Sequence, residues 1–89
     1  MIHFATVHSP EWIDIQLREI ARSTPEPHRV WGCLNGIDPS WNDRFHHAID
    51  LDGKHGEKLN ALAELILDEA SDDDLIVFID GDAFPLPGW

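Results

Sequence analysis

The sequence predicts an α/β protein with element order β-α-β-β-α-β, in which three layers are built on a mostly parallel four-stranded sheet. Short apolar runs typical of strands alternate with two longer segments whose apolar residues recur at helical spacing. The last run, Leu75 to Ile79, is apolar at every position, which is typical of a central strand covered on both faces. No internal repeat or low-complexity segment interrupts this alternation. We therefore expect residues 1–89 to form a single domain.

The first β-α unit occupies residues 2–27. Ile2 to Val7 is a short β-compatible run, and Ser9 and Pro10 follow it closely. Serine is a favoured N-cap residue and proline suits the first helical position, so a helix should begin there. Two prolines, at positions 25 and 27, end this helix. Its apolar stripe consists of Ile13, Leu17, Ile20 and Ala21.

The rest of the chain supplies two short strands, a helix and a final strand. Arg29 to Leu34 is predicted as the second strand, and His47 to Leu51 as a short third strand whose polar residues suit a sheet edge. The second helix should extend from about Glu57 to Ala70, and Asp72 to Asp74 should form a solvated turn after it. The apolar residues that follow the helical period are Leu59, Leu62, Ala63, Ile66, Leu67 and Ala70.

The charge balance limits the classes of ligand. The chain has 6 Lys and Arg against 17 Asp and Glu, a formal net charge of −11 with neutral histidines. Such a field repels nucleic acids and anionic lipid surfaces, so we expect neither as a partner. A small anionic ligand can still bind where a divalent cation or a set of backbone N–H groups neutralises it locally.

Cysteine usage and hydropathy indicate a cytoplasmic protein without membrane insertion. Cys33 has no second cysteine to pair with and lies in an apolar run, where it is expected to be buried. The apolar stretch Ile2 to Val7 has no basic leader and is too short for a signal-peptide core or a membrane span.

Asp80 and Asp82 directly follow the last apolar run. Ligands of open parallel sheets bind beyond the carboxyl ends of the strands, where the connecting loops diverge. Gly81 separates the two carboxylates and can adopt backbone angles closed to other residues, so both could turn toward one cation. Two carboxylates suit a hard, oxygen-ligated ion, and we predict Mg²⁺ or Mn²⁺.

The segment from Leu75 to Trp89 resembles a signature of GT-A fold glycosyltransferases of the inverting, family-2-like group: an apolar strand, D-x-D, then proline and tryptophan. The resemblance extends loosely over the whole chain, because the first strand, its loop and the helix before the acidic strand also match. It implies a Rossmann-like partial domain of the GT-A type. It further implies that this domain binds a nucleoside-diphosphate sugar together with a metal.

The resemblance also implies roles for individual residues. Asp82 would coordinate the metal directly, and Asp80 would contact the donor's ribose or reach the metal through water. The positions that correspond to nucleotide-contacting positions of the family are Thr6, His8, Ser9, Asn35, Asp38, Lys58, Asn60 and Asp80.

A full GT-A domain continues past its metal motif into an acceptor half that supplies the catalytic base. We therefore expect residues 1–89 to be a truncated donor-binding half that does not transfer sugar by itself. A parallel sheet that lacks further strands would expose the edge of the Leu75 to Ile79 strand. We expect a homodimer through that edge.

Other interpretations of the same features are open. The acidic pair could be a solvated strand end in a small self-associating α/β domain without catalysis. A phosphoryl transferase of the haloacid-dehalogenase type also uses D-x-D after an apolar strand, but that motif follows the first strand and precedes a threonine, whereas Ala83 follows here. A zinc site is disfavoured because the spacing of the neighbouring candidates fits no zinc template; these are His46, His47, Asp50 and His55.

Overall fold

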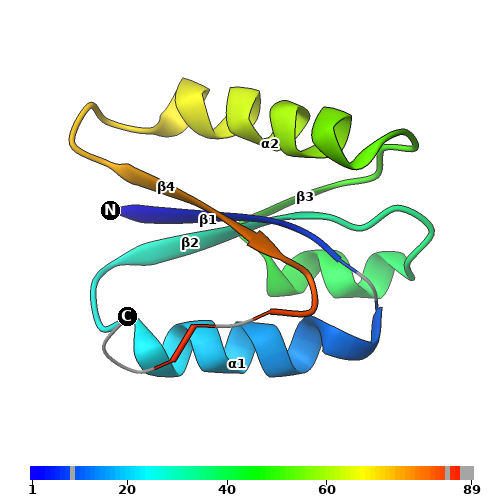
Figure 1. Cartoon of the computed structure of the whole chain (residues 1–89), viewed down its shortest axis with the longest axis horizontal. Coiled ribbons are helices and arrows are strands. Elements are labelled where there is room, and N and C mark those ends of the chain that lie inside the picture. Colours follow the sequence, from blue (N-terminus) through cyan, green and yellow to red (C-terminus); the bar gives the residue numbers. More distant parts are fainter. Residues whose placement is uncertain (9, 84, 87–89) are drawn as a thin grey trace.

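The computed structural model, which describes residues 1–8, 10–83 and 85–86, contains one four-stranded parallel sheet (Figure 1). The strands are β1 (Ile2–Val7), β2 (His28–Cys33), β3 (His47–Ile49) and β4 (Leu75–Asp80), in the spatial order β3-β2-β1-β4. Each neighbouring pair is parallel, with Val7 opposite both Cys33 and Asp80. The predicted α/β class, and a sheet consistent with a partial Rossmann-like fold, are confirmed.

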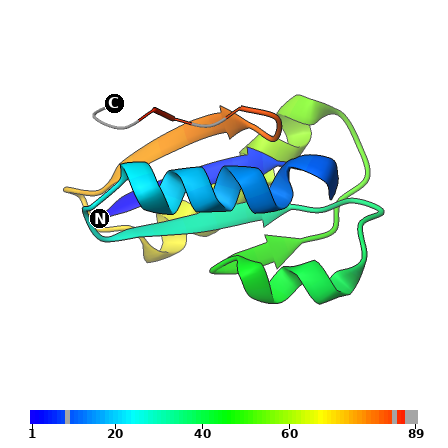
Figure 2. The same cartoon turned by 90° about the horizontal axis from the view of Figure 1, so that it is seen from below.

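Helices cover both faces of the sheet. A short 3₁₀ turn, η1 (Pro10–Trp12), leads into α1 (Ile13–Ser23) on one face, where η2 (Pro39–Arg44) also lies. The second helix, α2 (His55–Glu69), covers the opposite face; Figure 1 shows the resulting three layers, and Figure 2 shows α1 lying across its face of the sheet. Among the described residues, no helix is long and apolar enough to cross a membrane.

The element boundaries differ slightly from those predicted. The predicted N-cap Ser9 lies outside the described residues, and the α-helix begins only at Ile13, after the 3₁₀ turn. The start of α2 lies two residues before the predicted one, because the Lys54 backbone N–H donates to the Glu57 carboxylate (3.4 Å) and caps the helix there. These shifts leave the order of elements unchanged.

The two faces of the sheet have separate apolar clusters. Alternate residues of a strand point to opposite faces, so Ala5 packs beneath α2 while its neighbours face α1. Gly32 makes room for Phe45: a Cβ at this position would lie 2.8 Å from the Phe45 ring. The buried members of these two clusters are Ala5, Trp31, Cys33, Leu62 and Ile66 on the α2 side, and Ile13, Leu34 and Phe45 on the α1 side.

The last strand is an edge strand: the exposed edge predicted for it is confirmed, and the central position that its apolar run predicts is wrong for the described sheet. Among the described residues, β4 pairs with β1 alone. Leu75 and Phe78 are each 53% exposed. Apolar residues on both faces of a strand say nothing about whether both of its edges are paired, which explains the error.

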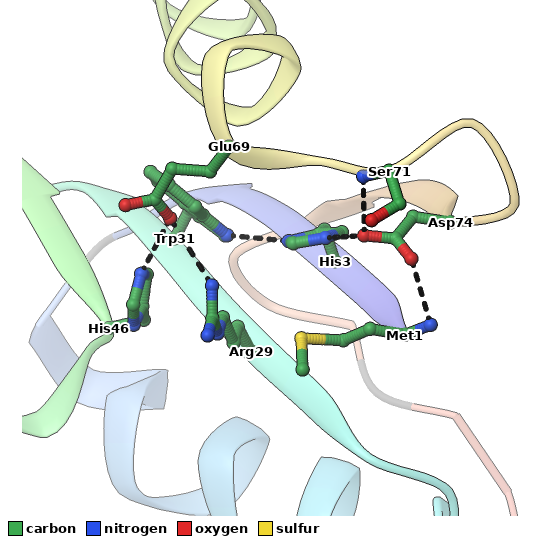
Figure 3. A network of polar contacts seen from close by, with 8 residues as sticks. All are labelled: Met1, His3, Arg29, Trp31, His46, Glu69, Ser71 and Asp74. Carbon is green, nitrogen blue, oxygen red and sulfur yellow. Dashed lines mark hydrogen bonds and ion pairs between the residues drawn. The ribbon is translucent and has the colours of Figure 1, made fainter.

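The turn predicted to be solvated contains one structural residue, Asp74. Its carboxylate contacts the amino group of Met1 (3.0 Å), the Nε2 of His3 (2.8 Å) and the backbone N–H of Ser71 (3.1 Å), as Figure 3 shows. These contacts, with that of His3 the largest, hold the pKa of Asp74 well below its ordinary value. Asp72 and Asp73 are exposed as predicted.

The same contacts fix the protonation pattern of His3, which is fully buried. The Trp31 indole N–H donates to His3 Nδ1 (3.1 Å), and an indole nitrogen can only donate. His3 Nδ1 is therefore unprotonated, and Nε2 carries the proton that is donated to Asp74. Beside this group, Glu69 accepts from His46 (2.9 Å) and Arg29 (3.3 Å) (Figure 3).

Candidate functional site

The carboxyl ends of β1 and β4 lie where the chain changes direction across the sheet. From β1 the chain moves through β2 to β3 on one side, then returns through α2 to β4 on the other side. The helices α1 and α2 leave this edge on opposite faces (Figure 1). Loops that diverge in this way leave a crevice that binds ligands in open α/β sheets. A cavity of about 410 Å³ lies at this point, and its wall consists of Val7, His8, His55, Asp80, Gly81 and Asp82.

Gly81 allows the two strands to approach each other at the floor of this cavity. A Cβ at this position would lie 2.9 Å from the Cα of His8, and closer still to the carbonyl oxygen of Val7. Among the described glycines, a positive φ occurs at Gly36 and Gly53 but not at Gly81. The sequence therefore predicted the right residue for the wrong reason: the requirement is steric and does not involve unusual backbone angles.

The acidic pair is exposed at the mouth of the cavity. The Asp80 side chain is 76% exposed, and its Oδ1 lies 3.9 Å from Nε2 of His55. Asp82 is also exposed, in a turn closed by a hydrogen bond from the Ala83 N–H to the Asp80 carbonyl (3.0 Å). Within the described part of the chain, no three His, Cys, Asp or Glu side chains converge as a metal site. A cation held here would therefore have two carboxylates and leave its other positions to ligand and water.

His8 forms the buried wall of the cavity. It is only 8% exposed and packs against Phe45, with 5.3 Å between the ring centroids. Among the described residues, neither ring nitrogen has a hydrogen-bond partner. Burial lowers the pKa of His8 to about 4, and the neighbouring Gln16 amide partly opposes this shift. At neutral pH the ring is uncharged and offers one donor and one acceptor.

Gln16 connects α1 to the acidic turn. Its side chain is buried, and Nε2 donates to the carbonyl oxygens of Asp80 (2.7 Å) and Ala83 (2.6 Å). No sequence motif pointed to Gln16, although one signal was present. Gln16 interrupts the inward face of a helix between the buried Ile13 and Ile20, and a polar residue there needs a partner.

His55 is a second residue that sequence reasoning did not place in this site. It had been considered only as a zinc ligand with neighbours in sequence, and the described residues do not form such a group. The structure places it at the first turn of α2, because that helix begins at the carboxyl edge of the sheet. The place of His55 in the cavity wall depends on the crossover that brings α2 beside β4, which the sequence does not show.

The other predicted residues lie away from the cavity wall. Thr6 is fully buried within β1, and its hydroxyl has no hydrogen-bond partner among the described residues. Asn35 donates to Asp52 (3.4 Å), and Asp38 caps η2 by accepting from the Ser40 N–H (2.9 Å), a hydrogen bond that lowers the pKa of Asp38.

Two further predicted positions are on α2, outside the cavity. Asn60 lines a separate groove of about 300 Å³ beside Phe78, and Lys58 contributes to neither wall. Ser9 lies outside the described residues, as do Phe84 and Trp89 of the family-like segment. The predicted residues that the structure brings together are thus His8, Asp80 and Asp82.

Comparisons of the chain with protein-family models, with curated proteins and with solved structures found no match. The fold and the cavity define an α/β protein with a polar, acidic crevice at the point where its strand order reverses.

Proposed function

We propose that the cavity binds a nucleoside-diphosphate sugar together with Mg²⁺ or Mn²⁺, as the donor-binding part of a metal-dependent glycosyltransferase. One observation supports this proposal most strongly. Asp80, Asp82 and the buried, unpartnered His8 share one cavity at the switch point of a parallel sheet. The D-x-D segment that resembles the family thus lies where such folds bind ligands.

The charge of the site determines how a diphosphate could bind. With a net charge of −11 on the chain and two carboxylates at the cavity mouth, an anionic ligand needs a cation beside it. Asp80 and Asp82 would hold that cation, since hard divalent ions prefer carboxylate, water and phosphate oxygens. The positive end of the α2 dipole, at His55, adds a favourable potential for phosphate. When bound, the cation would neutralise charge on a departing diphosphate.

His8 suits a different part of the ligand. Burial keeps the His8 ring uncharged at neutral pH, so the part of the cavity wall that it forms suits an uncharged part of the ligand, such as a sugar or a nucleobase. The proposal concerns donor binding, and among the described residues we assign no base for an acceptor hydroxyl.

Calorimetric titration with UDP and GDP, with and without Mn²⁺, tests the proposal. We expect binding that requires Mn²⁺ and that weakens by on the order of tenfold or more in Asp82→Asn, because one of two carboxylate ligands is lost. Asp72→Asn is the matched control, since it makes the same charge change at an exposed position that precedes β4, at the end of the sheet opposite the cavity. Absence of Mn²⁺-dependent binding in the native chain, or equal weakening by both variants, would overturn the proposal.

A second candidate function is self-association through the edge of β4. The supporting observation is the exposure of apolar side chains on β4: Leu75 and Phe78 are each 53% exposed, and Phe78 also lines the groove on α2. Two copies of charge −11 repel each other, so a dimer should strengthen with salt. Light scattering at tens of micromolar should give a dimer mass in the native chain and a monomer mass in Phe78→Lys. A native monomer at both low and high salt would exclude this function.

A further inference from the structure

The turn that presents the acidic pair is held from two sides. On one side, the Nε2 of Gln16 donates to the carbonyl oxygens of Asp80 (2.7 Å) and Ala83 (2.6 Å), the residues at the two ends of the turn. On the other side, the backbone of Gly81 rests against the carbonyl oxygen of Val7. Movement of the turn toward β1 is therefore limited by the Val7 carbonyl, and movement away from α1 would break two hydrogen bonds.

The chemistry of the amide makes this contact specific. A carbonyl oxygen can only accept, so the amide orientation is fixed with both N–H bonds directed at the turn. Both donors of Gln16 are then used, and Gln16 is 1% exposed, so water cannot readily replace the contact. The Gln16 side chain comes from α1, a helix on the face opposite α2. Its two hydrogen bonds connect α1 to Asp80 and Ala83, which follow Gln16 in the sequence by 64 and 67 positions.

We infer that Gln16 is a positioning residue, which holds the turn from Asp80 to Ala83 so that both carboxylates face one cavity. Gln16 is not part of the cavity wall and acts through the backbone of the turn. The consequence for ligand binding rests on the proposed function, whereas the hold on the turn can be measured without any ligand.

Two variants and one control test this inference. Gln16→Met keeps the side-chain length but has no donor, and Gln16→Glu keeps the shape but places carboxylate oxygens against the two carbonyls. Ser23→Ala is the control, because it removes another buried hydrogen bond of α1, from Ser23 Oγ to the Glu19 carbonyl (2.6 Å), which is remote from the turn. In the native chain, the Gln16 side-chain amide protons should exchange slowly with solvent, a result that requires no variant to fold.

Backbone amide exchange and Mn²⁺ calorimetry are then compared across these chains. We expect both Gln16 variants to exchange the amides of residues 81–83 about tenfold faster or more, and to bind Mn²⁺ about tenfold more weakly. Amides of β1 and β2 should be unaffected, and Ser23→Ala should change neither readout. A global loss of stability would instead raise the exchange rates of all protected backbone amides together.

The outcomes separate the inference from the proposed function. Rapid exchange of the Gln16 side-chain amide in the native chain, or unchanged exchange at residues 81–83 in the variants, overturns the positioning role and leaves nucleotide binding standing. If the native chain binds neither Mn²⁺ alone nor UDP or GDP with Mn²⁺, the proposed function fails. In that case faster exchange of the turn in Gln16→Met still supports the positioning role, and unchanged exchange refutes it.

Discussion

Protonation of His8 should make the fold sensitive to mild acid. The ring is 8% exposed and burial lowers its pKa from 6.5 to about 4, so the folded state disfavours the charged form. Between these two values the unfolded chain binds more protons than the folded chain, and stability falls as the pH falls. The contribution of the neutral His8 ring to the free energy of unfolding is fully present above pH 6.5. Proton linkage gives a loss of about 2 kcal/mol between pH 7 and pH 5, and about 3 kcal/mol by pH 4.

That loss is a large part of the stability expected for a domain of this size. Urea unfolding followed by circular dichroism at pH 7, 6 and 5 measures it, with His8→Gln as the non-titrating comparison of similar size. Subtracting the two stability curves isolates His8, because the carboxylates and other histidines are common to both chains. A difference between the two free energies of unfolding that stays constant from pH 7 to pH 5 would show that His8 is not buried as a neutral ring.

Three further substitutions have expected outcomes. Gly81→Ala should cost about 2 kcal/mol of unfolding free energy or displace the turn, because its Cβ meets the Val7 carbonyl; native-like urea unfolding with unchanged Mn²⁺ affinity would contradict this. Asp74 has a lowered pKa, so its stabilisation is present above its ordinary value of 3.8 and is lost as the pH falls further; Asp74→Asn should destabilise the chain at pH 7 and flatten the acid limb of the stability curve. Trp31→Phe should cost about 1–3 kcal/mol, because it leaves the buried Nδ1 of His3 without its donor; thermal unfolding identical to that of the native chain would refute it.

The sequence predicted the order of elements because that order depends on local periodicity. The 3.6-residue repeat identified α2, and the apolar runs identified β1 and β4, to within a few residues. The apolar run by itself could not show that β4 is an edge strand, since the position of a strand in a sheet is decided by which strands it pairs with; the exposed edge was expected only because the resemblance implies further strands. A run such as Leu75 to Ile79 has the same composition in either position.

The sequence predicted the site residues that lie together in one segment. It did not predict the site residues that come from segments far apart in the sequence. Asp80 is the last residue of β4 and Asp82 follows two positions later, so their place at the carboxyl end of the strand could be inferred. Gln16 and His55 come from two helices on opposite faces, and their roles depend on the crossover of α2 and on the path of the turn. For Gln16, burial of a lone polar residue on an apolar helix face was the available signal.

The central place of β1 also determines when the cavity can form. The ion pair between the amino group of Met1 and Asp74 joins residues 73 positions apart, and β1 pairs with β4 across a similar separation. Closing so long a loop is slow compared with forming β1, α1 and β2, which are contiguous. We therefore expect β4 to pair with β1 late in folding. Docking of β4 brings Asp74 to His3 at one end of the sheet and forms the acidic crevice at the other, so a chain without docked β4 should bind no ligand there.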